Sequence, residues 1–466
     1  MEASASNFIL DSSAGLYKSL LVLINRKSIL ITPAILFLFL CQNQSAEADT
    51  WSSLGYGAKN QSMANSTMSL PTDAYSQSYN PSLMAFQPKV LASFGMEGSI
   101  AKFENISGVI VDTPSLSGTS NYTTGSVDTQ VPDSFLYTIG IQAPLSKKAE
   151  DPLHLGIIVS SPVAKVLGID TQDAYQPQYA MYLNDTQRLH FETNLAKALS
   201  ENLALGLGAQ IYYIQGTTST ARLPTGAGNN STARLRADVK PAVAPTAGLT
   251  YTAGETKNLS LGFVYRGKQD SRSQVDFSNI IGLGFGSNPF VLTATNSLYF
   301  DPETFMLGAS YLSGKNKFSA STHFERWSDF SGTTMVLTFT TFKDTFHQTL
   351  ADTKYHDVFT WHAGYEHGIS EDLAIRLGYA YIPSPVPDQN GESNVLDSDK
   401  HEGFIGAGYK WQSDLTDGPL HIDACAFLHY LTPKTVTKVS GLSVGAPGYK
   451  IGGTVFGYGI TMTAEY

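Results

Sequence analysis

The last eleven residues of the chain, 456–466, alternate between apolar and polar side chains and end on an aromatic residue. Successive side chains of a strand point to opposite faces, so this segment has one apolar face and one polar face. A buried strand of a soluble protein also alternates. An aromatic end on an alternating strand favours a wall between lipid and a polar lumen. The C-terminus therefore predicts a transmembrane antiparallel β-barrel.

The composition agrees with this fold class and excludes others. No stretch after Cys41 is apolar enough to span a bilayer as a helix, and only helices and closed barrels satisfy their backbone groups in lipid. The chain holds 41 Gly, 24 Tyr and 24 Phe, which suits barrel strands with aromatic girdles. A net charge of −10 argues against a nucleic-acid partner. Cys425 is the one cysteine after Cys41, so we expect no intramolecular disulfide.

The N-terminus carries the pattern of a signal peptide. Arg26 and Lys27 precede an apolar run, 29–41, which is followed by polar residues and then by Ala46-Glu47-Ala48. A basic region, a short apolar region and a small-x-small site predict secretion, with residues 1–48 removed and a mature chain starting at Asp49. A misassigned start and an uncleaved anchor are the alternatives for this unusually long leader.

Six short polar turns alternate with seven longer, loop-like segments along the rest of the chain. An even number of strands, with short turns on one side and long loops on the other, is typical of bacterial outer-membrane barrels. Counting turns and loops predicts fourteen strands within residues 89–466. The longer segments run roughly over 104–132, 164–185, 216–240, 268–302, 331–354, 384–400 and 432–452.

Residues 49–88 precede the first strand and do not follow the strand pattern. They mix apolar and small residues and contain two early glycines, Gly55 and Gly57. A segment here would start on the periplasmic side, either as a disordered tail or as a compact plug in the lumen. The apolar content favours the plug, since disordered tails are usually charged and poor in apolar residues.

Several motifs of the chain resemble those of the FadL/TodX-type outer-membrane transporters of long-chain fatty acids and other hydrophobic compounds. Gly55-Tyr56-Gly57-Ala58 and Asn80-Pro81-Ser82 resemble the N-terminal hatch of that family, whose motif reads Asn-Pro-Ala, so Ser82 is a departure. Further matches in order along 49–466 include residues 261–266, 307–311, 324–330, 381–388 and 406–409.

This resemblance implies a fourteen-stranded barrel (residues 89–466) plugged by a hatch (residues 49–88). It also implies uptake of hydrophobic compounds without an energy source. Extracellular loops would capture the ligand and an internal pocket near the mature N-terminus would receive it. The ligand would then leave sideways through a gap at a kinked third strand. Fatty acids and aromatic hydrocarbons both remain open as ligands, and segments 216–240 and 268–302 are the expected capture surface.

Four residues are candidates for lining the internal pocket: Trp51, Tyr56, Arg266 and Arg376. A guanidinium pairs well with a ligand carboxylate. The alternative, which we favour, is that Arg266 and Arg376 neutralise acids inside the lumen. Trp51 and Tyr56 would equally well pack within the plug.

The expected third strand, residues 153–163, ends with Ser160-Ser161-Pro162. Proline cannot donate to the strand ladder, so Pro162 is expected to weaken the pairing locally. These three residues are candidates for the lateral gap. The alternative is a proline that simply ends the strand.

No pattern in the chain points to catalysis, a cofactor or a metal. His356, His362, His421 and His429 lack the cysteine or carboxylate spacing of a metal site. Residues 441–445 read Gly-x-Ser-x-Gly, but neither His nor Asp follows Ser443, so the order of a nucleophile-elbow triad is not met. We expect neither an enzyme nor a cofactor.

Three function classes follow from these observations: a transporter of hydrophobic compounds, a porin for polar solutes, and a structural barrel. The plug-like N-terminus favours the transporter. Its expected location is the outer membrane of a Gram-negative bacterium. Its expected partners are hydrophobic small molecules, outer-membrane lipid and lipopolysaccharide, and the barrel-assembly machinery through the last strand. We expect a monomer.

Overall fold

The computed structural model describes residues 55–112, 121–131, 133–145, 152–163, 176–182, 189–223, 232–254, 256–281, 288–332, 336–340, 345–348, 353–412 and 418–466. The predicted signal peptide, its cleavage site and Trp51 lie outside these residues. Within the described part, no helix is both long and apolar enough to cross a membrane.

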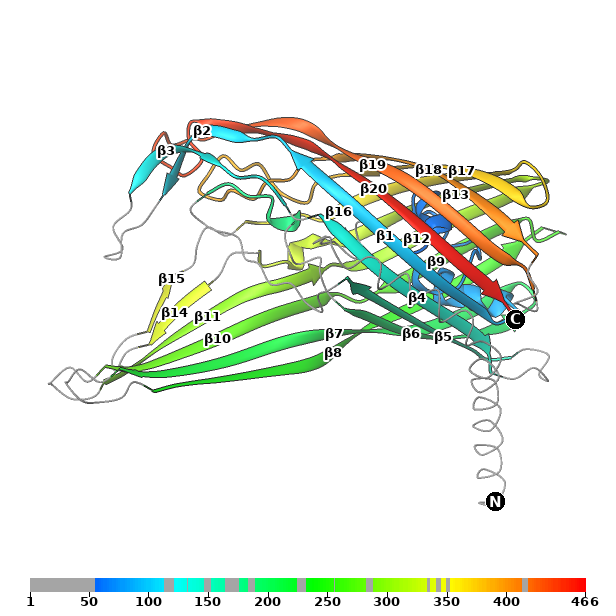
Figure 1. Ribbon diagram of the computed structural model, residues 1–466, viewed down its shortest axis with the longest axis horizontal. Helices are drawn as coiled ribbons and strands as arrows, with labels where there is room; N and C mark the ends of the chain where they lie inside the picture. The colour runs from blue at the N-terminus through cyan, green and yellow to red at the C-terminus, as the bar shows by residue number, and fades with distance from the viewer. Residues whose placement is uncertain are drawn as a thin grey trace, which may run out of the picture.

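Fourteen strands of the described residues close into an antiparallel barrel, as the turn count predicted (Figure 1). Each strand pairs with its neighbour in the chain, and the last pairs with the first. In chain order they are β1 (Leu91–Phe103), β4 (Ser134–Pro144), β5 (His154–Pro162), β6 (His190–Ser200), β7 (Leu203–Leu223), β8 (Thr232–Ala253), β9 (Leu259–Arg266), β12 (Glu303–Ser313), β13 (Asn316–Arg326), β16 (Val358–Gly368), β17 (Leu373–Ile382), β18 (Lys400–Trp411), β19 (Leu420–Thr437) and β20 (Gly448–Glu465).

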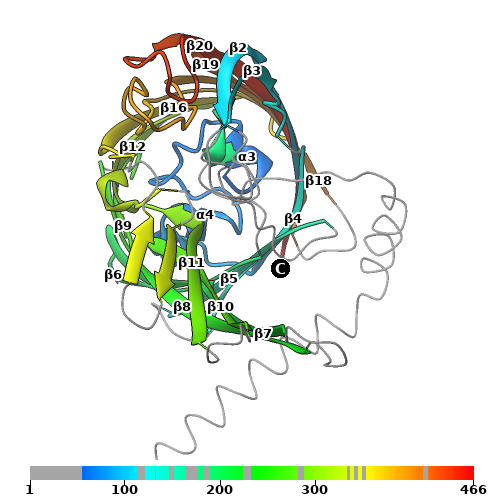
Figure 2. The ribbon, with the colours of Figure 1, turned by 90° about the vertical axis from the view of Figure 1, so that its left-hand side faces the viewer.

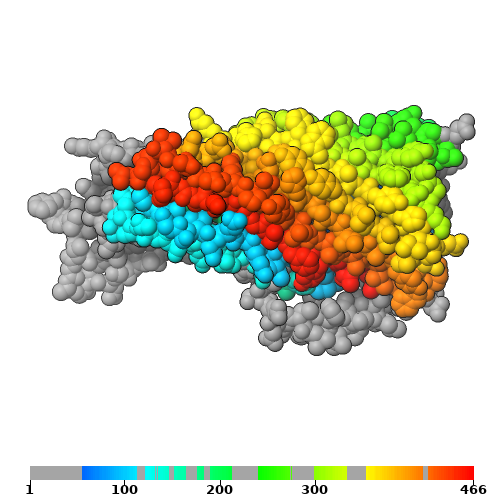
Figure 3. Space-filling model, turned by 90° about the horizontal axis from the view of Figure 1, so that it is seen from above, coloured from blue at the N-terminus to red at the C-terminus, as the bar shows by residue number. Residues whose placement is uncertain are grey.

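The C-terminal strand closes the ring as its alternating pattern predicted. β20 pairs with β1 from Leu91↔Glu465 to Phe103↔Gly453, and the two strands lie side by side on the outer wall (Figure 3). Tyr458 and Ile460 are exposed on the outside, while Thr461 is fully buried inside. The apolar face therefore meets lipid and the polar face meets the lumen.

Part of the loop prediction is wrong, because several of the longer segments contain paired strands. β7 and β8 run far beyond the barrel wall as one hairpin, and β10 pairs with β7 there in parallel (Figure 1). Long polar runs interrupt the alternation of apolar and polar residues in these extensions, as at residues 269–274, so the strand pattern does not identify them. The additional strands are β2 (Ile106–Asp112), β3 (Tyr122–Val127), β10 (Gln269–Ile281), β11 (Asn288–Asp301), β14 (Val336–Thr340) and β15 (Thr345–Gln348).

Residues 55–88, which we call the lumenal segment, lie inside the barrel (Figure 2). They form three short helical pieces, α3 (Ala58–Gln61), α4 (Ser76–Tyr79) and η1 (Pro81–Phe86). The sequence explains the start of η1, since Pro81 opens the first turn and the Asn80 side chain accepts a hydrogen bond from the Ser82 amide at 3.1 Å. Most residues of the segment up to Met84 are buried.

Candidate functional site

The barrel wall is shaped to the lumenal segment by glycines that face inward. A Cβ built on Gly364 would lie 2.7 Å from the Met63 carbonyl oxygen, and one on Gly262 would lie 2.7 Å from the Met68 carbonyl oxygen. Both distances are too short for a real Cβ, so a larger side chain would displace the segment. The same holds on most strands of the ring, for Gly140, Gly156, Gly206, Gly248, Gly308, Gly378 and Gly406.

Sequence reasoning did not single out these glycines, although a signal was present. Gly262 and Gly364 fall on the polar, lumenal face of their strands, where glycine in a strand marks a close approach of other backbone. The lumenal segment and the wall are therefore complementary in shape.

Asn80, Pro81 and Ser82 dock the segment on β8. Asn80 Nδ2 donates to the Met68 carbonyl oxygen and to Thr250 Oγ1, each at 2.9 Å. Ser82 Oγ lies 2.7 Å from the same Thr250 hydroxyl. All three motif residues are fully buried. The motif thus positions the segment against the wall through polar contacts inside the lumen.

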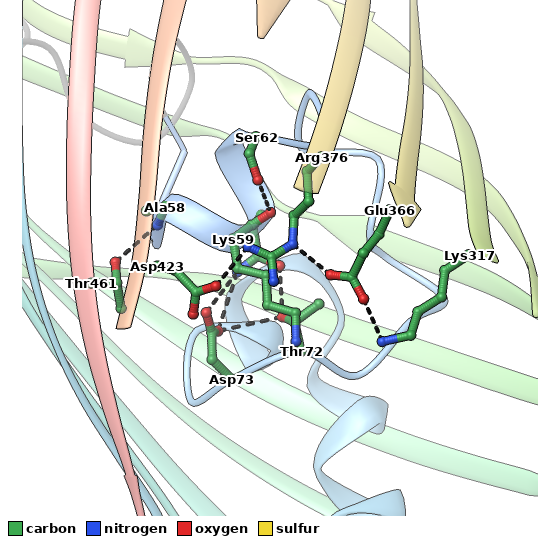
Figure 4. Close-up of polar contacts among 11 residues, drawn as sticks. Ala58, Lys59, Ser62, Thr72, Asp73, Lys317, Glu366, Arg376, Asp423 and Thr461 are labelled. Atoms are coloured by element: carbon green, nitrogen blue, oxygen red, sulfur yellow. Dashed lines mark hydrogen bonds and ion pairs between the residues drawn. The ribbon is translucent and has the colours of Figure 1, made fainter. Parts of the chain in front are cut away.

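A charge network joins the first helix of the segment to the opposite part of the wall (Figure 4). Arg376 donates through Nη1 to Asp423 Oδ1 at 2.6 Å and through Nε to Glu366. Lys317 Nζ lies 2.6 Å from the other Glu366 oxygen. Lys59 of α3 lies among these groups, and burial lowers its pKa.

Asp73 is the acidic group of the lumenal segment in this region (Figure 4). Its carboxylate accepts hydrogen bonds from the Tyr75 amide at 2.8 Å and from Asn60 Nδ2 at 3.2 Å. Burial raises the pKa of Asp73 to about 6. A small polar opening beside it is lined by Lys59, Asp73, Asp423 and Glu465 among others, which does not suit an apolar ligand.

The structure places both predicted arginines against protein groups. Arg376 forms ion pairs with Glu366 and Asp423, so it neutralises acids inside the lumen, which is the alternative favoured from the sequence. Arg266 of β9 is buried, and its Nη2 donates to the Ser78 carbonyl oxygen of the lumenal segment. Arg266 therefore holds α4 to the wall.

Tyr56 lies at the centre of a small apolar cluster between the segment and the third barrel strand. Its ring centroid is 6.3 Å from that of Tyr75, and both residues pack with Ile158 of β5. Tyr56 is fully buried. Its ring is thus next to the strand that carries the lateral-gap candidates.

Those candidates, Ser160, Ser161 and Pro162, lie where the ladder between β5 and β6 stops. The β5–β6 pairing ends at Ser160↔His190, whereas the β4–β5 pairing continues to Leu136↔Pro162. Among neighbouring barrel strands in the described residues, β5 and β6 share the shortest ladder. The Oγ of Ser160 is buried and has no hydrogen-bond partner among the described residues.

The candidate histidines contact protein groups. His362 lies 2.9 Å from the Ala64 carbonyl oxygen, His429 lies 3.3 Å from Glu402, and His421 lies 3.1 Å from Glu465. In the described part of the chain, no group of three or more His, Cys, Asp or Glu is arranged to hold a metal ion. In the Gly-x-Ser-x-Gly loop, Ser443 Oγ donates to the Ser440 carbonyl oxygen at 2.9 Å.

Comparisons with solved structures find the same fold. A Pseudomonas aeruginosa FadL homologue superposes with a TM-score of 0.59 at 17% identity, over 91% of this chain and 99% of that chain. The Pseudomonas putida toluene transporter TodX gives 0.53 at 14% identity, over 89% and 99%. The Ralstonia pickettii toluene transporter TbuX gives 0.51 at 11% identity, over 90% and 100%. A comparison with curated protein sequences gives no match.

The sequence shows which protein family the chain belongs to. The pattern of the family described as outer membrane protein transport protein (OMPP1/FadL/TodX) matches residues 40–466, which include the whole predicted mature chain. The chain is therefore an outer-membrane β-barrel and a member of the OMPP1/FadL/TodX family of transport proteins.

Proposed function

We propose that the protein takes up long-chain fatty acids or similarly hydrophobic compounds passively across the outer membrane, without catalysis or a cofactor. The ligand is captured at the extracellular end and passes to an internal pocket. Residues 49–88 gate that pocket as a hatch, and the ligand leaves sideways near β5. Membership of a family of hydrophobic-compound transporters supports this proposal.

One observation carries the proposal beyond family membership, namely the fit of the lumenal segment to the wall. Backbone atoms of Met63 and Met68 occupy the space in front of Gly364 and Gly262. A polar solute needs a continuous water path, whereas an apolar solute gains from apolar surface and from the bilayer itself. A lumen filled in this way favours apolar cargo.

The short β5–β6 ladder supports the sideways exit. Pairing stops at Ser160 and His190, so within the described residues β5 and β6 share fewer paired positions than any other two neighbouring barrel strands. The adjacent Tyr56–Ile158 cluster offers apolar surface on the lumenal side. An apolar ligand at this position would pass into the bilayer rather than into water.

Aromatic hydrocarbons are the alternative cargo. TodX and TbuX are toluene transporters and CymD is a monoaromatic hydrocarbon channel, and all three share this fold. Mass spectrometry of compounds retained after purification in mild detergent distinguishes the two classes. Recovery of fatty acids supports the first, and recovery of aromatic hydrocarbons supports the second. Recovery of neither, across several detergents, would count against a hydrophobic-compound transporter.

The polar-solute porin is the competing function of a different class. We expect the full-length protein to pass almost no ion current in a planar lipid bilayer, and a variant lacking residues 49–88 to conduct freely. Free ion current through the full-length protein would refute the gating role of the hatch. We further propose that the protein acts as a monomer, surrounded by outer-membrane lipid and lipopolysaccharide. Its last strand would be recognised by the barrel-assembly machinery.

A further inference from the structure

A short strap crosses the mouth of the barrel at the end opposite the short turns. It consists of residues 176–182, which include η2 (Ala180–Tyr182), and we call it the mouth strap. It comes from the connection between β5 and β6. Figure 2 looks into this end of the barrel and shows the short helical turn of the strap within the ring of strands.

The strap is paired with the connection between β17 and β18. Gln178 forms an isolated parallel bridge with Val395. The Gln178 amide donates to the Asn394 carbonyl oxygen at 3.1 Å, and the Leu396 amide donates to the Gln178 carbonyl oxygen at 2.8 Å. Two connections that belong to different parts of the ring are thus joined above the lumen.

Successive residues of the strap pack in two different apolar clusters. Tyr179 and Leu396 belong to an apolar cluster with Phe103 of β1 and Leu431 of β19. Ala180 and Val395 belong to a second cluster, which includes Phe330 and Tyr355 beside β13 and β16. The first cluster adjoins β1, β19 and β20 and the second adjoins β13 and β16, so the strap lies between two different parts of the ring.

Tyr179 anchors the strap to the first wall. Its ring stacks on Phe103 with the centroids 4.0 Å apart and an angle of 14° between the planes. Its hydroxyl donates to the Gly452 carbonyl oxygen and accepts from the Gly452 amide, each at 3.0 Å. Tyr182 adds a hydrogen bond to Asp397 at 2.8 Å.

The apolar contacts that close the mouth can be exchanged for contacts with an apolar ligand, whereas the hydrogen-bonding groups of the strap would have to find water as their partner when it moves away. If the strap moved away in water alone, two apolar clusters would be exposed, which is unfavourable. An apolar ligand covers the same surfaces and so binds the open form more tightly than the closed form. A ligand shifts an equilibrium only through such a difference in affinity.

We propose that the mouth strap is a gate selective for apolar solutes, which opens when such a solute replaces the strap between the two clusters. This rests on the proposed function and adds a second point of discrimination, ahead of the lumenal segment. The strap must leave Val395 and Leu396 in every uptake cycle.

A reversible cross-link tests the gate. Neighbouring strands lie about 4.8 Å apart, and disulfides join Cα atoms about 4.4–6.8 Å apart, so Gln178→Cys with Val395→Cys is suited to bridging. The matched control is Ser107→Cys with Ser126→Cys, an adjacent pair of the β2–β3 hairpin outside the strap. Uptake of radiolabelled oleate and of toluene is measured in cells before and after oxidation, with disulfide formation verified by mass spectrometry.

Oxidation of the strap pair is expected to lower uptake at least tenfold, and a reductant is expected to restore it. The control pair should show no change. Undiminished uptake with the strap disulfide formed would overturn the gate, while leaving the proposed function in place. Absence of uptake even in the unmodified and reduced proteins would instead refute the proposed function on which the gate rests.

Discussion

Arg376 Nη1 lies 2.6 Å from Asp423 Oδ1, and the same guanidinium donates through Nε to Glu366. One buried arginine on β17 therefore neutralises acids on β16 and β19. Replacing it removes the ion-pair partner of Asp423 and one of the two ion-pair partners of Glu366, beside a lysine of the lumenal segment (Figure 4).

We expect Arg376→Met to lower the free energy of unfolding by about 3–5 kcal/mol, as removal of one partner from a buried ion pair generally does. Denaturant unfolding in lipid vesicles, followed by tryptophan fluorescence, measures the change. Arg272→Met is the control, since its pair with Asp270 is half exposed and is worth about 1 kcal/mol or less. Equal losses in the two variants would show that the Arg376 network does not stabilise the barrel.

Shape complementarity between the lumenal segment and the wall predicts the effect of filling one glycine. Gly364→Val places a side chain where Met63 and Ser66 lie, so residues 55–88 are expected to be displaced. Ion current in planar bilayers should rise at least tenfold. Gly403→Val on β18 meets nothing within 4 Å and should leave the current unchanged. A current that stays at the original level in Gly364→Val would argue that the segment does not block the lumen.

Asn80→Ala removes the side chain that docks the Asn-Pro-Ser motif. The Met68 carbonyl oxygen and the Ser82 amide each lose their hydrogen bond to Asn80, and a buried group left without a partner costs about 1–3 kcal/mol. We expect faster hydrogen exchange in residues 76–86 with the barrel strands unaffected. Asn202→Ala, in the turn between β6 and β7, is the control. Unchanged protection of residues 76–86 would refute the docking role.

The pKa of Asp73 gives the docking a pH dependence. Burial raises this pKa from 3.8 to about 6. Between pH 4 and 6 the docked segment holds a proton on Asp73 that a released segment would give up. Docking is therefore stronger at pH 4 and weakens as the pH rises through this window, with no further change above pH 7.

Asp73→Asn removes this dependence because the amide does not titrate in that range. To measure this dependence, the hydrogen-exchange rates of residues 58–79 are determined at each pH, and the rate in the wild type is divided by the rate in the variant. We expect the ratio to change more than tenfold between pH 4 and pH 7, since one pKa unit corresponds to a factor of ten. A ratio that stays constant with pH would contradict the assignment.

Much of the barrel follows from the sequence because lipid imposes a strict rule on its strands. Where one face meets lipid, as at Tyr458 and Ile460, apolar side chains must recur at every second residue, so the strand can be recognised in the sequence. Where polar runs interrupt this alternation, as at the start of β10, the sequence pattern predicts a loop although the chain forms a paired strand.

The interior is harder to predict because its contacts join residues far apart in the chain. The Asn80-Pro81-Ser82 motif was recognisable, but its partner Thr250 is 170 residues away. Lys59 and Asp73 carry no local pattern that sets them apart from surface charges. The role of the inward glycines depends on the path of the lumenal segment, which strand periodicity does not specify. The strap residue Tyr179 likewise lies in a segment without periodicity.

The most direct test of the account compares uptake of apolar and polar solutes by the same protein. Proteoliposomes containing the full-length chain are given radiolabelled oleate, toluene and sucrose, with protein-free liposomes as the background. We predict that oleate or toluene enters at least tenfold faster than in the background and that sucrose does not. Sucrose uptake at a comparable rate, or no acceleration for either apolar solute, would contradict the account.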